Sequence, residues 1–361
     1  MAHRVFNFNP GPSTLPLAVL EKVQAELLDY RGSGMSIIES SHRSPEYDEV
    51  NESAMRLARE LFGLGDDYHI LFLTGGASMQ FAMIPLNLLP GGGTGVYVDT
   101  GTWSTKAIKE SKVVGATHVA FSGKDGDYKH IPSDAELDLP KDAAYVHITT
   151  NNTIKGTQFH HDPKVDAPLI ADMSSDIASC QRDFTRYAMF YAGAQKNLGP
   201  SGVTFVAIRD DLVQRSAAGL TMLNYKTHAD KKSLFNTPPS FSVYVLKLVL
   251  EWVRDQGGVA AVEKINAEKK QLIYGLMDQH PDFFRGTVEK DSRSWMNLTM
   301  RLPSEELEKK FIEGGKARQM TGLKGHRSVG GCRASMYNAM PVAGAKAVAD
   351  FMAEFKAANP A

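Results

Sequence analysis

The chain has 361 residues and a mass of 39.5 kDa, too long for one minimal domain, and its 43% hydrophobic content is ample for a large core. Its 40 lysines and arginines and 41 aspartates and glutamates give a net charge of −1, which argues against a nucleic-acid or membrane-surface binder. The two cysteines, Cys180 and Cys332, form no disulfide framework or zinc pattern, and the N-terminus lacks the apolar stretch of a signal peptide. The composition predicts a soluble, cytoplasmic globular protein.

Short apolar runs alternate with amphipathic segments through the first two thirds of the chain. One helix is expected to open at Pro16, with an apolar stripe that continues to Leu27 and Tyr30, and another follows Pro45. The expected strands are 69–73, 95–98, 118–121, 144–148, 169–171, 189–192 and 203–208. They are short and nearly free of charge, as is typical of a parallel sheet buried on both faces. The alternation predicts an α/β domain with a mostly parallel central sheet covered by helices.

The pattern changes after about residue 240. Helices are expected at 241–256 and 259–277, after Ser304 and from Pro341, with strands at 296–302 and 333–337. This mixture predicts a smaller α+β domain. We place it at residues 258–361 together with residues 1–15, and the large domain at 16–257.

A single lysine stands at the end of an apolar strand. Residues 190–202 run from apolar side chains through small ones to Lys196 and then to a Gly-Pro-Ser-Gly turn. A lysine on a rigid strand end with small neighbours can form a Schiff base with an aldehyde cofactor. Asp172 ends another apolar run, where a carboxylate can keep a pyridine nitrogen protonated. Alone, each has an ordinary alternative: a solvated loop lysine, and an aspartate that caps a turn or helix.

Three further features follow predicted strands. The Gly-Gly-Ala-Ser turn at 75–78 opens a helical run, and backbone N–H groups at such a turn can bind phosphate. Trp103 can stack on a cofactor ring, or simply pack in a core. Thr153 can donate its hydroxyl to a phenolic oxygen. Because ligands bind at strand ends of open α/β sheets, the set predicts a site for pyridoxal 5′-phosphate.

Longer motifs connect these residues to a known family. The chain resembles the phosphoserine aminotransferases, class-V pyridoxal-phosphate enzymes of fold type I, over essentially its whole length. The motifs that carry the resemblance are FNFNPGP at 6–12, SSHR at 40–43, TGGASMQ at 74–80, TW at 102–103, NNTI at 151–154, DMSS at 172–175, GAQKNLGP at 193–200 and NTPP at 236–239.

The resemblance implies a role for each residue of the cofactor site. Lys196 would hold the cofactor, Asp172 would pair with its ring nitrogen and Trp103 would stack on the ring, and these three are the expected catalytic residues. The implied cofactor-binding residues are Gly76, Ala77, Trp103, Thr153, Asp172, Gln195 and Lys196, with Asn236 and Thr237 supplied by the other subunit of a homodimer. Asn9-Pro10 stands where the family usually has a small polar residue that touches the substrate.

Two His-Arg pairs and one further arginine lie in glycine- and serine-containing loops. Guanidinium groups bind carboxylates and phosphates bidentately, although arginines in loops also form surface ion pairs. By the resemblance, Arg333 binds the α-carboxylate, and the side-chain anion of the substrate is bound by His42, Arg43, His326 and Arg327. No metal is expected. The doublet His160-His161, with Asp162 directly after it, has no third ligand at a useful spacing elsewhere, so residues 160–162 are interpreted as a solvated turn.

The implied reaction is the reversible transamination of O-phospho-L-serine and 2-oxoglutarate to 3-phosphooxypyruvate and L-glutamate, in L-serine biosynthesis. The family often also accepts 4-phosphohydroxy-L-threonine in pyridoxine biosynthesis. Another class-V aminotransferase, of the alanine–glyoxylate or serine–pyruvate type, is the main alternative. A cysteine desulfurase, a vitamin B6 binder without activity and a phosphate-binding structural module are the remaining ones.

Overall fold

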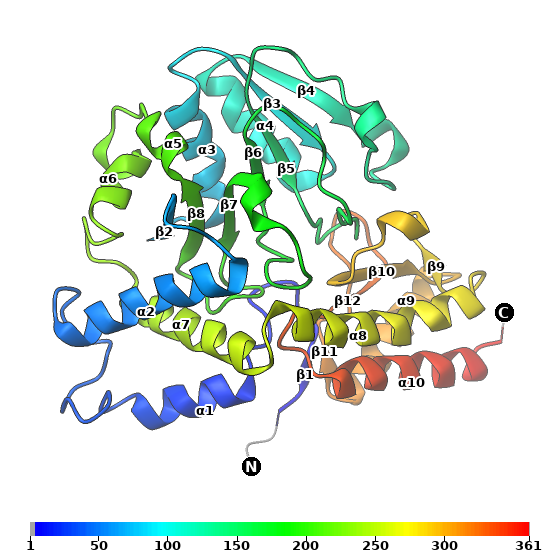
Figure 1. Cartoon of the computed structure of the whole chain (residues 1–361). Coiled ribbons are helices and arrows are strands. Elements are labelled where there is room, and N and C mark those ends of the chain that lie inside the picture. The colour runs from blue at the N-terminus through cyan, green and yellow to red at the C-terminus, as the bar shows by residue number, and fades with distance from the viewer. Residues whose placement is uncertain (1–3, 361) are drawn as a thin grey trace.

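A seven-stranded sheet forms the centre of the larger part of the molecule, of which this computed structural model describes residues 4–360 (Figure 1). The strands are β2 (Tyr68–Leu73), β3 (Thr94–Asp99), β4 (Thr117–Ser122), β5 (Ala143–Thr149), β6 (Leu169–Asp172), β7 (Tyr187–Gly193) and β8 (Thr204–Arg209), in the order β2-β8-β7-β6-β5-β3-β4. The pairs from β7 to β4 are parallel, and only β8 runs antiparallel to both of its neighbours. The prediction of a mostly parallel sheet is confirmed.

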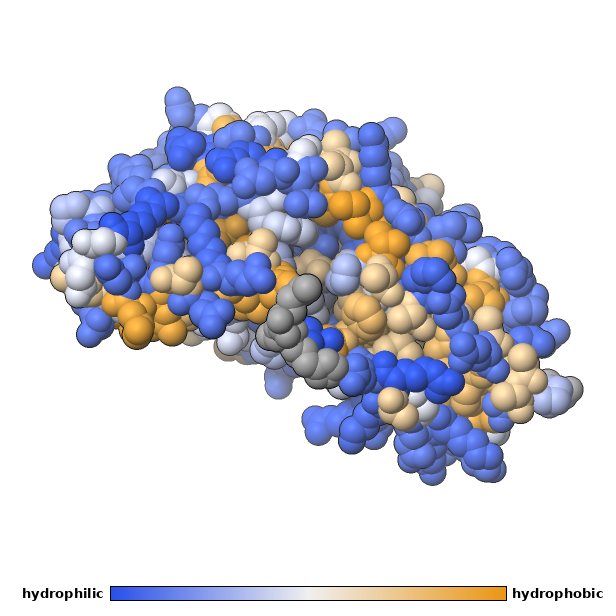
Figure 2. Space-filling view, turned by 90° about the horizontal axis from the view of Figure 1, so that it is seen from below, coloured by the Kyte–Doolittle hydropathy of each residue, from blue (hydrophilic) through white to orange (hydrophobic). Residues whose placement is uncertain are grey.

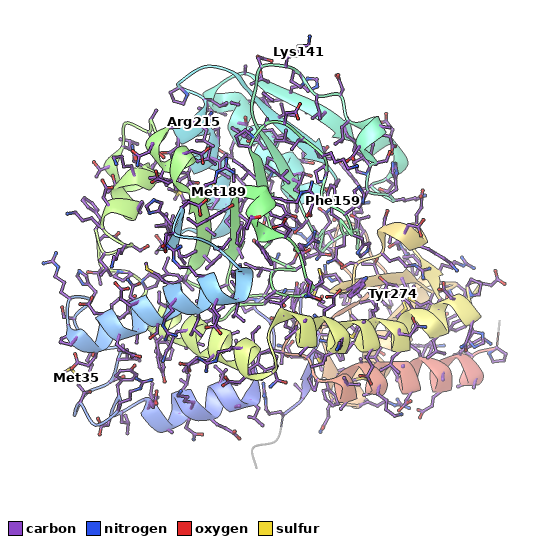
Figure 3. The ribbon with its side chains drawn as sticks, viewed as in Figure 1. Met35, Lys141, Phe159, Met189, Arg215 and Tyr274 are labelled. Atoms are coloured by element: carbon purple, nitrogen blue, oxygen red, sulfur yellow. The ribbon has the colours of Figure 1, made fainter. Side chains whose placement is uncertain are left out.

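The burial of β7 explains why this segment forms an inner strand. All seven of its residues are buried, and from Met189 to Ala192 successive side chains alternate between two apolar cores. Phe190 and Ala192 point into one core, whereas Met189 and Tyr191 point into the other. Met189 accordingly lies near the middle of the molecule (Figure 3). A strand with no solvent-facing side needs no polar alternation, which is why the sequence shows an unbroken apolar run.

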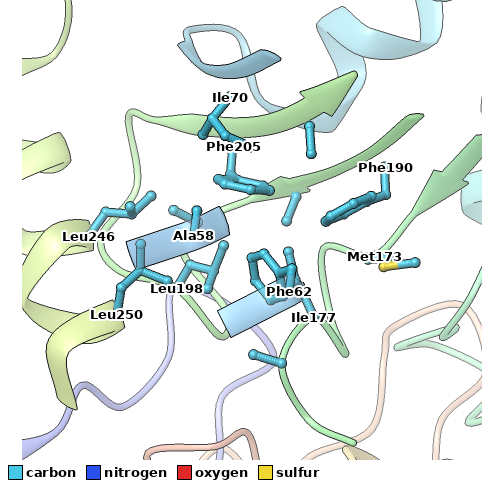
Figure 4. Packing of buried hydrophobic residues seen from close by; sticks show 14 of the residues in the cluster. Ala58, Phe62, Ile70, Met173, Ile177, Phe190, Leu198, Phe205, Leu246 and Leu250 are labelled. Atoms are coloured by element: carbon cyan, nitrogen blue, oxygen red, sulfur yellow. The ribbon is translucent and has the colours of Figure 1, made fainter. Parts of the chain in front are cut away.

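Helices cover both faces of the sheet. One face packs against α2 (Pro45–Phe62) and α7 (Ser240–Asp255), with α1 (Leu17–Glu26) outside them, and the other packs against α3 (Gly76–Leu88) and α4 (Thr102–Val114). The short helices α5 (Asp210–Gln214) and α6 (Tyr225–Asp230) border the second face. In the first core, Phe62 of α2 lies 5.6 Å from Phe190 and 5.7 Å from Phe205, centroid to centroid (Figure 4).

The helix predicted from Pro16 is shorter than its apolar stripe suggested. It ends at Glu26, and Leu27 is exposed. Tyr30 is buried from a turn beyond the helix, with its ring 5.6 Å from that of Tyr244 and its hydroxyl donating to Glu49. Packing against α2 and α7 therefore buries Tyr30 without continuing the helix, which periodicity alone could not show.

The C-terminal part has its own sheet and core. It comprises α8 (Val259–Gln279), β9 (Arg285–Gly286), β10 (Asn297–Arg301), α9 (Glu305–Ala317), β11 (Met320–Thr321), β12 (Cys332–Ser335) and α10 (Val342–Ala358). The sheet β12-β10-β9 is antiparallel, and β1 (Phe6–Asn7) pairs in parallel with β11. Phe8 belongs to this third core. The two-residue strands β1, β9 and β11 were not predicted, because two residues show no period.

The helix α8 connects the two parts. Val259 and Val262 pack in the first core, and Ile273 and Met277 pack in the third, so one helix belongs to both. Tyr274 marks the second half of α8 in Figure 3. Apolar side chains gather on the lower face (Figure 2), where a hollow of about 580 Å³ opens between α1, α7, α8 and α10. The exact boundaries at 16–257 and at 1–15 with 258–361 stay a prediction, and residues 1–3 lie outside the described chain.

The interpretation of residues 160–162 as a solvated turn is wrong for Asp162. Its side chain is only 10% exposed and forms ion pairs with Arg182 at 2.9 Å and Arg186 at 3.7 Å. The tertiary fold supplies these arginines from the segment after β6, which the local sequence does not indicate. Among residues 4–360 no three His, Cys, Asp or Glu side chains are arranged to hold a metal ion, and no helix is both long and apolar enough to span a membrane.

Candidate active site

The features singled out in the sequence meet at the carboxyl edge of the central sheet. Strands β2, β3, β5, β6 and β7 all run in one direction and end at this edge. Asp172 is the last residue of β6, and the segments that follow the other four strands carry Gly76, Trp103, Thr153 and Lys196. Parallel strands therefore bring together residues that are up to 120 positions apart in the chain.

Lys196 and Asp172 influence each other's charge. Burial lowers the pKa of the Lys196 amine, and the charge of Asp172 opposes this shift. Burial raises the pKa of Asp172, while Lys196 and the hydrogen bonds from Ser174 oppose that shift. The pair thus places a buried carboxyl group and a lysine of lowered basicity at one edge.

Ser174 fixes the orientation of Asp172. Its backbone N–H and its hydroxyl both donate to Oδ1 of Asp172, at 2.9 and 2.6 Å. Asp172 therefore closes a turn, as one of its two alternatives expected, and its pairing with a pyridine nitrogen stays a prediction. Within the described residues, Oδ2 of Asp172 receives no hydrogen bond and is left for another donor.

Trp103 is the second residue of α4 and lies beside the lysine. The Lys196 Nζ is 5.3 Å from the centroid of its ring. The indole N–H donates to Oγ1 of Thr153 at 3.0 Å, which fixes the plane of the ring. The Thr153 hydroxyl accepts that bond and keeps its own hydrogen free to donate.

The N-terminal segment packs against Lys196, although the two are far apart in the sequence. A Cβ on Gly11 would come within 3.3 Å of the Lys196 Cγ. Ser13 donates its hydroxyl to the Lys196 carbonyl at 2.7 Å and its N–H to the Gln195 carbonyl at 3.0 Å. In this segment the Pro10 carbonyl accepts from the Tyr337 hydroxyl at 2.6 Å. The contacts assign the FNFNPGP motif a packing role that the sequence alone did not indicate.

The Gly-Gly turn gives α3 an open N-terminus. Gly75 and Gly76 have φ of 87° and 63°, and a Cβ on Gly75 would come 2.5 Å from the Met79 Cβ. No side chain caps this helix, so the N–H groups of Gly76 and Ala77 face outward and are free to bind an anion. Gln195 is half-buried next to Lys196.

Arg333 comes from β12 of the smaller part and is 4% exposed. Its Nη1 donates to the Thr153 carbonyl at 2.6 Å, and among the described residues its buried Nε has no acceptor. Burial lowers the pKa of the guanidinium, and its charge lowers the pKa of Lys196. A buried cation with an unused donor beside the lysine is what a carboxylate site needs.

His326 and Arg327 lie on the loop between β11 and β12. His326 Nδ1 is 2.7 Å from the Ser328 hydroxyl. Burial lowers the pKa of His326, and the charges of Arg333, Arg327 and Lys106 lower it further. Several cations therefore converge on this loop.

His42, Arg43, Asn236 and Thr237 form a separate group. His42 Nδ1 lies 3.3 Å from the Thr237 hydroxyl, and Asn236 bonds to the Thr237 carbonyl. The hydrogen bonds found for these residues in the described chain do not reach Lys196, Asp172 or Trp103. The structure thus brings the two expected segments to each other but not to the lysine of the same chain.

Comparisons with known proteins agree on one family. Residues 5–348 match the family described as Aminotransferase class-V. The chain is 53% identical to the phosphoserine aminotransferase of Desulfosudis oleivorans, over 99% of this chain and 100% of that protein, and 53% identical to that of Geobacillus kaustophilus, over 98% of each. The chain belongs to the phosphoserine aminotransferases within the class-V aminotransferases.

Solved structures of phosphoserine aminotransferases have the same fold. That from Bacillus circulans subsp. alkalophilus superposes with a TM-score of 0.97 at 50% identity, covering 99% of both chains. A structure from Trichomonas vaginalis, described as PLP-bound, has a TM-score of 0.91 at 34% identity and covers 97% of this chain and 100% of that one. The fold-type I architecture expected from the sequence is confirmed.

Sequence reasoning missed several residues of this aminotransferase site. Ser174 was noted only as part of the DMSS motif and Gly11 only as part of FNFNPGP, and Ser13 was not considered. Lys106, one helical turn after Trp103, was not considered at all, although its Nζ lies 4.7 Å from the Trp103 ring centroid. The spacing of three residues from an expected site residue on an expected helix was the signal that could have found it.

Proposed function

We propose that the chain catalyses the reversible transamination of O-phospho-L-serine and 2-oxoglutarate to 3-phosphooxypyruvate and L-glutamate, with pyridoxal 5′-phosphate as cofactor. The observation that carries the proposal is the meeting of Lys196, Asp172 and Trp103 at one sheet edge beside a cluster of cations. Full-length identity of about one half to phosphoserine aminotransferases supports the substrate. The place of the reaction would be L-serine biosynthesis in the cytoplasm, where free thiols such as Cys180 and Cys332 persist.

The residues present fit this cofactor. Oδ2 of Asp172 is left for a pyridinium N–H, the Thr153 hydrogen is left for a phenolic oxygen, and the Trp103 indole offers a fixed face. Gly76, Ala77 and Gln195 would hold the phosphate through backbone and amide N–H groups. When bound, pyridoxal phosphate supplies an electron sink for the carbanion formed at the substrate Cα.

Lys196 would act as the base. Burial lowers its pKa and so favours the neutral amine, which would accept the proton from the substrate Cα and release it again later in the reaction. Asp172, held by Ser174, would keep a proton on the ring nitrogen because its negative charge lies buried beside it. Trp103 would hold the reacting plane through its bond to Thr153.

The cations would select the substrates. Phosphoserine and glutamate share an α-carboxylate, which Arg333 would bind with its unused Nε. His326 and Arg327 would bind the side-chain anion, a phosphate in one substrate and a carboxylate in the other. The alternative activity, transfer from alanine or serine, needs no second anion site and leaves this cluster of cations unexplained.

His42, Arg43, Asn236 and Thr237 would serve the site of a second copy in a homodimer. The segments that carry them expose apolar side chains: Ile38 is 55% exposed and Phe235 is 43% exposed. Exposed apolar residues of this kind are typical of surfaces that another protein covers. The loop with Met35 lies at the outer end of the molecule, between α1 and α2, where a second copy has access (Figure 3).

A complementation experiment tests the shared site. Lys196→Ala and Arg43→Ala proteins are each expected to turn over phosphoserine poorly. After subunit exchange, the hybrid dimer has one site with both residues intact, so the mixture should regain activity that neither protein has. A mixture that stays as inactive as its parts would contradict shared sites.

The proposed substrate is tested by adding phosphoserine without keto acid to the purified protein loaded with cofactor. Phosphoserine should change the absorbance of the bound cofactor, and 2-oxoglutarate should reverse the change. If alanine or serine causes the change and phosphoserine does not, the alanine-type activity is correct. The same assay with 4-phosphohydroxy-L-threonine tests the expected role in pyridoxine biosynthesis.

A further inference from the structure

Lys106 places a second amine beside Trp103. It lies on α4, one helical turn after the tryptophan, and its Nζ is 4.7 Å from the ring centroid. The Lys196 Nζ is 5.3 Å from the same centroid, so the two amines lie at most about 10 Å apart, the sum of the two distances. Both amines thus contact the same indole ring.

Lys106 differs from two other exposed lysines on helices. Lys310 and Lys346 each form an ion pair with an acidic residue four positions away, as expected for such spacing. Glu110 stands four residues after Lys106, but no ion pair within 4.0 Å joins them in the described chain. The Lys106 amine is directed over the indole instead.

The charge of Lys106 acts on His326, one of the residues expected to bind the side-chain anion. Lys106 is close enough to His326 for its charge to lower the pKa of the imidazole, together with Arg333 and Arg327. No carboxylate among the described residues acts on His326 in the opposite direction. The cluster is thus an excess of positive charge that an anionic ligand would neutralise.

We propose that Lys106 is a specificity-determining residue, which contacts the side-chain anion of the substrate and favours a phosphate dianion over a carboxylate. The inference rests on the proposed function. A lysine ammonium is a point charge, and its Coulomb attraction to a dianion is about twice that to a monoanion at equal distance. Arg333 does not discriminate in this way, because both substrates carry the same α-carboxylate.

The alternative is that Lys106 only supports the Trp103 ring through a cation–π contact. In that case the loss of the amine would disturb the ring plane and affect all substrates equally. The two roles therefore differ in the ratio of effects on phosphoserine and glutamate, and that ratio is the quantity to measure.

The test compares Lys106→Gln, Lys106→Arg and, as a matched control on the same helix, Lys109→Gln. KM and kcat are measured for phosphoserine and for glutamate at about 50 mM and 300 mM salt. Lys106→Gln should raise KM for phosphoserine about tenfold and KM for glutamate about two- to threefold, with kcat within about twofold. Both KM values of Lys106→Arg should stay near those of the wild type, and those of Lys109→Gln should equal them. High salt should reduce the difference in KM between Lys106→Gln and the wild type.

If Lys106→Gln raises KM by the same factor for both substrates, or changes neither KM, the inference is wrong. The proposed function is unaffected by that result as long as the wild-type protein turns over phosphoserine. A wild-type protein that leaves phosphoserine unchanged but reacts with another amino acid would overturn the proposed function, and the inference with it. An unchanged absorbance spectrum of the bound cofactor in Lys106→Gln, with the expected KM ratio, supports contact with the substrate rather than support of the ring.

Discussion

The proposed cofactor edge and the loops proposed to bind the substrate anion are built in different ways. Asp172 and Thr153 follow buried strands and are at most 4% exposed, whereas Arg43 and Arg327 are exposed on loops. Side chains at the ends of packed strands have fixed positions, which proton transfer at one atom requires. Loops adapt to ligands of different shape, which two substrates with different side-chain anions require. The difference indicates that reaction chemistry and substrate choice can change independently in this molecule.

The strongest test of the comparison is Lys196→Ala at the cofactor edge. Turnover should fall by at least about 10⁴-fold, because the Schiff-base amine and the proton acceptor are lost together. The fold should persist, since the amine forms no structural ion pair in the described chain. Steady-state turnover and thermal unfolding check both points. Turnover within about tenfold of the wild type would contradict the role of Lys196.

A smaller effect is expected for Arg333→Met, at the border of the two regions. KM should rise about 100-fold for phosphoserine and for glutamate alike, because one charge-assisted carboxylate contact is lost for both. Steady-state kinetics with each amino acid measures the two factors, and Lys324→Met, an exposed lysine near the same strand, is the control. A rise for phosphoserine alone would place Arg333 in the side-chain anion site instead.

Arg327→Ala, on the exposed loop, should weaken substrate binding and leave the stability of the fold unchanged. KM for phosphoserine should rise about tenfold, while the unfolding free energy changes by less than about 0.5 kcal/mol, since the side chain is solvent-exposed. Arg327→Lys should recover part of the affinity. Kinetics and urea unfolding of the same preparations check both values. A loss of stability above about 2 kcal/mol would show that the loop is part of the packed structure.

The smallest effect on activity is expected for His147→Gln. His147 is a buried residue of β5, before the end of the strand. Its Nε2 lies 2.8 Å from the Tyr191 hydroxyl, and burial lowers its pKa from 6.5 to about 3. The unfolded chain therefore binds a proton between about pH 6.5 and 3 that the folded chain does not, so stability falls as the pH drops through this range. The slope from this group is about 1.4 kcal/mol per pH unit below about pH 6.

Urea unfolding at pH 7, 6 and 5 measures the slope, and His147→Gln should remove this component. The variant should keep its KM for both substrates, because His147 touches no residue of the anion loops in the described chain. Equal pH slopes for the wild type and the variant would show that His147 is protonated in the folded protein.

The sequence by itself determined the α/β class, the seven strands of the large sheet and most of their helices. Local signals sufficed there, because a strand buried on both faces must be apolar throughout and a helix needs one apolar stripe. The motifs also gave the residues that meet at the cofactor edge, since parallel strands place their carboxyl ends together. The resemblance of these motifs to the phosphoserine aminotransferases added the expected role of each residue.

Only the tertiary structure decided how distant residues meet. The antiparallel direction of β8 follows from its partners β2 and β7 and not from its composition. Asp162 became buried because Arg182 and Arg186 arrive from another segment, and Ser13 reached Lys196 across 183 residues. The charge of Lys106 acts on His326, which lies 220 positions away in the chain. Such contacts are long-range, and their energies depend on distances and desolvation that no local pattern encodes.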